Sequence, residues 1–128
     1  MLFRSQFFGG VAAEELFYGA RGISVGSQND IEKATNMLDT MVNRLSMYSR
    51  SKLDYSKFKN ESAAEHGLVQ LEAKADELYS HTLKSIGDYR EVMESIKGEL
   101  MDRYVLSKDD IFALLEERLD PAPLRQAA

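Results

Sequence analysis

Apolar residues recur at helical spacing along most of the chain, in segments separated by glycines or polar runs. In the first third, apolar side chains three and four residues apart stand at Ile31, Ala34, Leu38, Met41, Val42 and Leu45. This period is typical of an amphipathic helix, which the sequence predicts from Asn29 or Ser27 as N-cap to about Met47. An earlier helix is expected to end near Gly19, because Gly19 and Gly22 can adopt the positive φ that stops a helix.

Three more helices are predicted in the second half of the chain. Each opens with a capping pattern in which a polar residue stands three positions before an acid: Ser62 and Glu65, Asp88 and Glu91, Ser107 and Asp110. We expect the first to stop at Gly87, the second to turn Leu100 and Tyr104 inward, and the third to end at Pro121. Residues 48–60 lack helical spacing and are expected to form a loop. The sequence therefore predicts an all-α fold, a helical bundle of four or five helices with short connections.

Composition narrows the class of protein. With 128 residues, 44% of them hydrophobic and 29% charged, the chain has the size and composition of one globular domain, predicted to span residues 1–128. A net charge of −5 argues against a nucleic acid partner. The absence of cysteine excludes disulfides and cysteine metal sites. No apolar run is long enough to cross a bilayer, so we expect a soluble, cytoplasmic chain as encoded.

Asp30 is the candidate with the most informative position. It falls in the first turn of the predicted 29–47 helix, where the helix dipole stabilises a carboxylate. Steps of four, three and four residues connect it to Ala34, Met37 and Met41, which places it at the edge of the buried stripe. A carboxylate near a core is costly unless it is paired or coordinated. Two interpretations stand, a helix-start aspartate stabilised by the dipole, or a ligand.

Two blocks of sequence carry a resemblance to a known family. Residues 9–19 read Gly-Gly-Val-Ala-Ala-Glu-Glu-Leu-Phe-Tyr-Gly, and residues 24–35 read Ser-Val-Gly-Ser-Gln-Asn-Asp-Ile-Glu-Lys-Ala-Thr. They resemble, in order and separation, the Gly-Gly-x-Ala-Ala-Glu-Glu helix and the Asn-Asp-Leu-x-x-Ala-Thr segment of the FtsH family of ATP-dependent zinc metalloproteases. The resemblance implies that Asp30 is the third protein ligand of a catalytic zinc ion. It thereby makes residues 9–47 the metal-site half of the domain.

The resemblance extends over nearly the whole chain, with one departure. Residues 100–111 are similar to the ending of the family's peptidase domain, so residues 61–120 correspond to its C-terminal helices. The family's Gly-Met-Ser element aligns with Ser46, Met47 and Tyr48 here. This sequence therefore departs from the family's pattern in the segment that follows the 29–47 helix.

The family's metal-binding motif, His-Glu-x-x-His, is not in this sequence. The two histidines, His66 and His81, are fifteen residues apart and match it neither in spacing nor in context. We therefore interpret them as exposed helix-face residues, and expect the motif to precede Met1. Glu14 and Glu15 have two interpretations, a second-shell hydrogen bond to a ligand imidazole or an ordinary solvent, capping or ion-pair role.

These observations leave two hypotheses for the function. In the first, the chain is the C-terminal helical part of a zinc metalloendopeptidase and is inactive alone because the histidine pair is missing. The resemblance then implies zinc as cofactor, unfolded or membrane protein substrates, an attached AAA ATPase module, a hexameric ring and a membrane anchor. The phosphate-binding motif of an ATPase, Gly-x-x-x-x-Gly-Lys-Ser/Thr, is not encoded in this sequence. In the second, it is a non-catalytic helical scaffold or assembly module derived from that fold.

Overall fold

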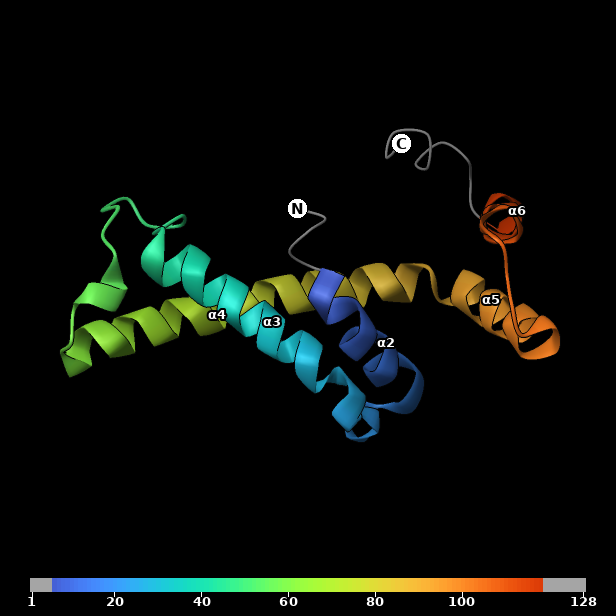
Figure 1. Cartoon of the computed structure of the whole chain (residues 1–128), viewed down its shortest axis with the longest axis horizontal. Helices are drawn as coiled ribbons and strands as arrows, with labels where there is room; N and C mark the ends of the chain where they lie inside the picture. The colour runs from blue at the N-terminus through green and yellow to red at the C-terminus, as the bar shows by residue number, and fades with distance from the viewer. Residues whose placement is uncertain (1–5, 119–128) are drawn as a thin grey trace. The chain divides into compact units, whose positions relative to one another are not determined.

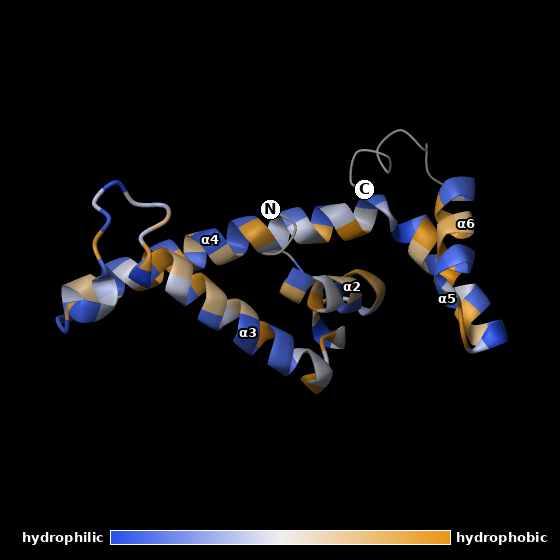
Figure 2. Cartoon of the chain, turned by 45° about the horizontal axis from the view of Figure 1, so that its top comes forward, coloured by the Kyte–Doolittle hydropathy of each residue, from blue (hydrophilic) through white to orange (hydrophobic). Residues whose placement is uncertain are grey.

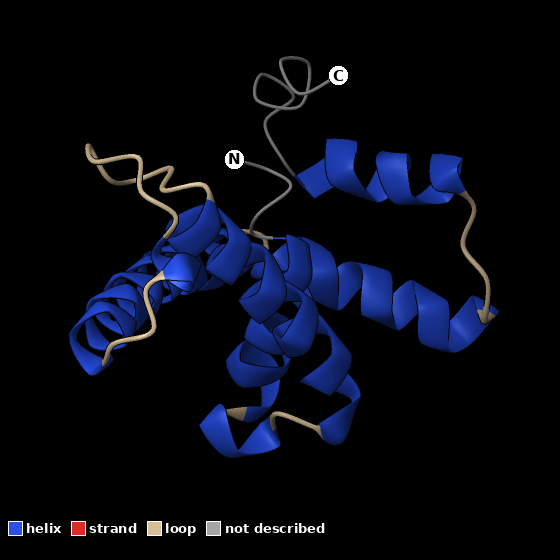
Figure 3. Ribbon diagram, turned by 60° about the vertical axis from the view of Figure 1, so that its left-hand side comes forward, coloured by secondary structure: helices blue, strands red, loops and turns tan. Residues whose placement is uncertain are grey.

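The computed structural model describes residues 6–118, and within them the secondary structure is helical with no strand (Figures 1 and 3). The α-helices are α2 (Gly9–Tyr18), α3 (Gln28–Asp39), α4 (Glu61–Asp88), α5 (Arg90–Arg103) and α6 (Lys108–Arg118). Short turns are η1 (Gln6–Phe8), η2 (Ala20–Gly22), η3 (Val25–Ser27), η4 (Thr40–Arg44) and η5 (Tyr55–Lys57). The predicted all-α class is confirmed. The predicted end of the last helix at Pro121 lies outside the described residues.

The chain divides into two compact units, residues 1–86 and residues 87–128. The boundary falls in the last turn of α4, next to Gly87, the predicted stop of this helix. The helix continues through Gly87 to Asp88 because glycine in a last turn permits a stop without imposing one. The sequence-based assignment of one domain to residues 1–128 stays a prediction.

The buried apolar residues of the first unit come mainly from α2, α3 and η4. They are Val11 and Ala12 of α2, Ala34 and Leu38 of α3, Met41 and Val42 of η4, and Leu78 of α4. Figure 2 shows the hydrophobic positions of α3 alternating with hydrophilic ones along the helix. The helical period in the sequence thus produces the expected buried stripe.

Gly19 ends α2 as predicted. It has φ of +76°, and its N–H donates to Glu15 O at 2.7 Å. Gly22 does not have positive φ, and its role is a close approach of two turns. A Cβ at Gly22 would lie 2.2 Å from Tyr18 Cβ, so no larger residue fits there without movement.

The end of the 29–47 helix differs from the prediction. After Asp39 the chain forms η4, a π-helical turn closed by a hydrogen bond from Leu45 N–H to Thr40 O at 2.9 Å. A π turn inserts one extra residue and rotates the following side chains about the helix axis. The prediction that Leu45 is buried is therefore wrong. The prediction that Ile31 is buried is also wrong, since its side chain is exposed in the first turns of α3.

The helix starts in the second half show which capping patterns are used. Ser107 and Asp110 form the predicted capping box, because Ser107 N–H donates to Asp110 Oδ2 at 2.8 Å and Asp110 N–H donates to Ser107 Oγ at 3.2 Å. At α4, by contrast, Asn60 is the cap: its Oδ1 accepts from Ala63 N–H at 2.7 Å. The second helix of this half, α5, has Tyr89 as N-cap with no side-chain capping bond. The expected inward positions of Leu100 and Tyr104 are wrong, since both are exposed.

Candidate functional site

Asp30 lies in the first turn of α3 and faces the start of α2. Its side chain is 46% exposed, and a Cβ placed on Gly10 would meet Asp30 Oδ2 at 3.9 Å, an ordinary contact distance. Within residues 6–118 its recorded ion pair is with Lys33 Nζ at 3.8 Å, on the same helix. An exposed pair of that length contributes little stabilisation. The carboxylate of Asp30 therefore sits at the edge of the core with its oxygens largely uncommitted.

Glu14 is in the opposite situation, because its carboxylate fixes the connection between α2 and α3. Glu14 Oε1 accepts hydrogen bonds from Ser27 Oγ at 2.8 Å and from Ser24 Oγ at 3.1 Å, and Glu14 Oε2 accepts from Ser24 N–H. These bonds, the backbone N–H of Ser24 foremost, hold the pKa of the Glu14 carboxyl below its usual value. Ser27 is the residue that precedes α3, so Glu14 sets where the helix carrying Asp30 begins.

Glu15 connects α2 to α4. Its Oε2 accepts a hydrogen bond from the Tyr79 hydroxyl, and the Tyr79 ring packs edge-on against Phe8 with ring centroids 5.7 Å apart. Desolvation, followed by the Glu15 hydrogen bond and charge, raises the pKa of Tyr79 to about 12. The two adjacent glutamates thus bind different parts of the first unit, as expected for helix neighbours that point in different directions.

These three carboxylates do not form a metal site by themselves. A catalytic zinc takes three protein ligands and an open position. In the part of the chain that the structure describes, no group of three or more His, Asp or Glu side chains could hold a metal ion. Both histidines are exposed on α4, and the His66 ring lies beside the Tyr55 ring at a tilt of 45°, with ring centroids 5.4 Å apart. Of the three candidate carboxylates, Asp30 has the fewest contacts, one long ion pair with Lys33, and the described residues do not on their own fit a zinc ion.

The sequence singled out three carboxylates as candidates, and their role as site residues stays a prediction; it did not single out their hydrogen-bond partners. Ser24, Ser27 and Tyr79 determine how Glu14 and Glu15 are held, and none of them was a candidate. The spacing of Ser24 and Ser27 immediately before a predicted helix is a signal of a structured loop. Tyr79 gives no comparable signal, because its contact joins positions 64 residues apart.

A helix long and apolar enough to span a membrane is not found in the described range of the chain.

Comparison with known proteins places this arrangement among peptidases. The model of peptidase family M41 matches residues 4–114. The chain is 32% identical to the ATP-dependent zinc metalloprotease FtsH of Mesomycoplasma conjunctivae, over 91% of this chain and 17% of that protein. It is 31% identical to the ATP-dependent zinc metalloprotease FtsH of Helicobacter pylori, over 85% of this chain and 19% of that protein.

A eukaryotic relative matches the same part. The ATP-dependent zinc metalloprotease YME1 homolog of Schizosaccharomyces pombe is 32% identical over 80% of this chain and 15% of that protein. The chain thus spans less than a fifth of the length of each of these relatives. No solved structure matches.

Proposed function

We propose, from the fact that the chain belongs to peptidase family M41, that it is the C-terminal helical part of an ATP-dependent zinc metalloendopeptidase. The observation that carries the proposal is the family match over residues 4–114, which includes both sequence blocks around Glu14 and Asp30. The relatives are named zinc metalloproteases, so zinc belongs to the family. Action on unfolded polypeptides, an AAA ATPase partner, a hexameric ring and a cytoplasmic location belong to the proposal for this chain.

Within this proposal Asp30 is a zinc ligand. The support is the contrast between the carboxylates: Glu14 accepts three hydrogen bonds and Glu15 accepts one from Tyr79, whereas Asp30 has one long ion pair. A free, half-exposed carboxylate on a rigid helix start is suited to coordinate a metal ion held also by other residues. Glu14 supports the site by fixing the start of α3, and Glu15 by fixing α2 to α4. Their second-shell role toward a ligand imidazole stays a prediction.

The zinc-binding experiment must supply the two histidine ligands that this chain does not contain. The chain is mixed with, or fused behind, a helix that carries His-Glu-x-x-His, and zinc binding is measured by competition with a chromophoric chelator. We expect tight zinc binding and chelator-sensitive cleavage of unfolded casein in the combined protein. Asp30→Asn is expected to weaken zinc retention by at least about tenfold with unchanged helix content, because loss of a partner that only orients a metal ligand already costs about ten- to a hundredfold. Glu32→Gln, on the exposed face of the same helix, is the matched control.

A second candidate, the non-catalytic helical scaffold, is favoured by the lack of a three-ligand group within residues 6–118. It predicts that the combined protein retains no zinc above the level of the isolated chain. It also predicts that Asp30→Asn lowers the melting temperature, because the aspartate then serves only the helix start. The zinc titration and the thermal melt of the same variant therefore decide between the two functions.

A further inference from the structure

The connection between α3 and α4 concentrates positive charge in an acidic chain. Residues 44–59, here named the basic loop, contain five basic residues, Arg44, Arg50, Lys52, Lys57 and Lys59. Asp54 is the loop's one acid, so the loop carries +4 while the whole chain carries −5. A local excess of this size creates a positive potential that attracts acidic groups.

The basic loop has a defined conformation. Buried Ser46 takes φ of +45°, its O accepts from Lys52 Nζ at 3.0 Å, and its Oγ donates to Leu53 O. Asp54 accepts hydrogen bonds from the N–H and hydroxyl of Ser56, which lower the pKa of the Asp54 carboxyl together with the charges of Lys57 and Arg44. The single acid of the loop is thus already bound within it.

Three cations of the loop remain available. Arg50, Lys57 and Lys59 are exposed, and none of them forms an ion pair with another residue in the described range. Lys52 is bound to Ser46, and Arg44 Nε lies 3.9 Å from Asp39 Oδ2. The positive potential of the loop is therefore offset only in part, by Asp54 close to Lys57 and by Asp39 close to Arg44.

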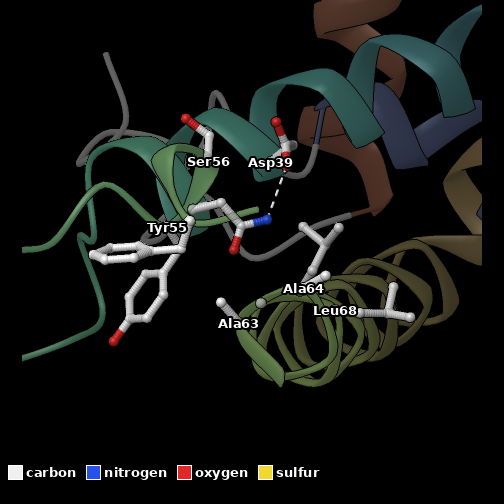
Figure 4. A pocket seen from close by; sticks show the side chains of 10 residues that line it. Asp39, Tyr55, Ser56, Ala63, Ala64 and Leu68 are labelled. Carbon is white, nitrogen blue, oxygen red and sulfur yellow. Dashed lines mark hydrogen bonds between the residues drawn. The ribbon is translucent and has the colours of Figure 1, made fainter. Parts of the chain in front are cut away.

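Two hollows with largely apolar walls lie beside η5, and Lys57 and Lys59 flank Phe58, a residue of both walls, in the sequence. The first has a volume of about 420 Å³ between η5, the end of α3 and the start of α4; Figure 4 shows Ala63, Ala64 and Leu68 of α4 along one side and Asp39 and Ser56 on the other. The second, of about 400 Å³, shares Tyr55, Phe58 and Ala63 with the first and includes Leu53. Ligand pockets in proteins have volumes of about 300–1,000 Å³. Each hollow has room for a large apolar side chain.

From this combination we infer that the basic loop and its two hollows bind an acidic polypeptide segment that carries an apolar or aromatic anchor. The anchor enters the hollow beside Tyr55 and Phe58, and acidic residues on either side of it meet Arg50, Lys57 and Lys59. Concave hollows favour a polypeptide over a lipid surface, because a membrane is bound by apolar side chains that protrude.

Asp39 makes the inferred binding selective. Its carboxylate lies in the wall of the first hollow, where it accepts a hydrogen bond from Asn43 Nδ2 at 2.8 Å. A second carboxylate inside the hollow would be repelled by it, whereas an apolar side chain would not. The acidic residues of the partner are therefore directed to the lysines on the rim. This site is separate from Asp30, and the inference does not depend on the proposed peptidase function.

The test measures binding of a fluorescein-labelled peptide with a central Leu-Phe flanked by glutamates. We expect fluorescence anisotropy to show binding that weakens as salt is raised. The double variant Lys57→Glu with Lys59→Glu is expected to weaken binding roughly tenfold, since rim charges govern electrostatic association. Phe58→Ala keeps the charge of the loop but removes part of the wall of both hollows, and is expected to weaken binding as well.

A matched double variant, Lys84→Glu with Lys97→Glu, changes the net charge equally on α4 and α5 and is expected to leave affinity within twofold. Circular dichroism verifies that each variant is folded. Replacing the peptide's glutamates with lysines, or its Leu-Phe with Ala-Ala, is expected to abolish binding. Equal binding by both double variants, or no binding of the acidic peptide at all, would overturn the inference. Binding of phosphatidylserine vesicles without binding of the peptide would overturn it in favour of a membrane surface.

Discussion

The two units of this chain are stabilised in different ways. In residues 6–86 seven apolar side chains from four elements are buried, whereas in residues 87–118 one is, Val92. The second unit instead has polar contacts at a helix junction: Arg103 donates to both oxygens of Asp110, at 3.1 and 3.3 Å, and Asp110 bonds Ser107. A segment this short cannot bury enough apolar surface to form an independent core.

The exposed apolar residues also have different surroundings in the two units. The second unit exposes a set of large apolar side chains, namely Leu100, Met101, Tyr104, Val105 and Phe112. Tyr104, at 83% exposure, is also the residue in left-handed conformation that ends α5. Its conformation is set by the helix terminus, and the ring has no core to enter. In the first unit, two exposed apolar residues of the basic loop, Leu53 and Phe58, instead border defined hollows.

The largest expected effect on stability comes from a substitution in the core of the first unit. Leu38 of α3 is 4% exposed, and Leu38→Ala is expected to lower the free energy of unfolding by about 2–4 kcal/mol, because it removes buried methyl groups and leaves a cavity. Ile31→Ala on the exposed side of the same helix is the control, with an expected loss below about 1 kcal/mol. Urea unfolding followed by circular dichroism measures both. Equal losses at the two positions would contradict the assignment of the core.

A smaller effect is expected from the caps. Ser107→Ala removes the hydroxyl that accepts from Asp110 N–H and is expected to cost about 1 kcal/mol, felt as lower amide exchange protection in α6. Ser62→Ala is the matched control, because Asn60 and not Ser62 caps α4, and it is expected to change protection by less than about 0.5 kcal/mol. A full capping loss at Ser62 would show that the sequence pattern, and not the observed hydrogen bond, describes that helix start.

A glycine-to-alanine substitution is expected to stabilise the second unit but not the first. Nothing lies within 4 Å of a Cβ built on Gly98 in α5, so Gly98→Ala is expected to raise the free energy of unfolding by about 0.5–1 kcal/mol. In α4, a Cβ on Gly67 would lie 2.6 Å from Asn43 Oδ1, and Gly67→Ala must displace an amide that is bonded to Asp39. That displacement is expected to cancel the helix gain or reverse it. Thermal melts of the two variants side by side measure the difference, and a gain at Gly67 equal to that at Gly98 would disprove the close contact.

Much of this fold follows from local sequence signals. The period of Ala34, Leu38 and Met41 specifies the buried face of α3, and Gly19 specifies the end of α2, because each signal depends on neighbours along the chain. Leu45 was misplaced since a π turn has no signature in the hydrophobic period. Asn60 was missed as a cap because Ser62 and Glu65 offered a stronger pattern nearby.

At the candidate site, too, the sequence indicates local positions but not tertiary contacts. The helix position of Asp30, which is local information, left two interpretations open, and only the resemblance implied a ligand. That Glu14 bonds the residues before α3 and that Glu15 bonds Tyr79 follow from tertiary packing. The departure at Ser46 from the family's glycine coincides with a left-handed φ of +45°, a conformation that glycine adopts at lower cost. Only the resemblance marked that position.

The smallest expected effect is a difference in how the stability of each unit depends on pH. The pKa of Tyr79 is raised from 10.0 to about 12 in the folded chain, so its contribution to stability is complete below pH 10 and is lost as pH rises toward 12. Hydrogen bonds from Ser107 and then from Arg103 lower the pKa of Asp110 from 3.8 to about 2, so its contribution is complete above pH 4 and is lost as pH falls toward 2. Alkali should therefore loosen the first unit, and acid the capping box of the second.

Two variants isolate these contributions, because other groups also titrate at both extremes, among them Glu14 with its lowered pKa in the first unit. Tyr79→Phe is expected to flatten the alkaline loss of stability between pH 10 and 12 and to reduce the phenolate absorbance change near 295 nm as pH approaches 12. Asp110→Asn is expected to remove the acid-dependent loss of amide protection in α6 below pH 4 while leaving that of α2 unchanged. If Tyr79 ionised near pH 10.0, its ordinary value, its hydrogen bond to Glu15 would be absent in solution. If Asp110→Asn altered α2 and α6 equally, the two units would unfold as one, and the contrast between them would not extend to their stability.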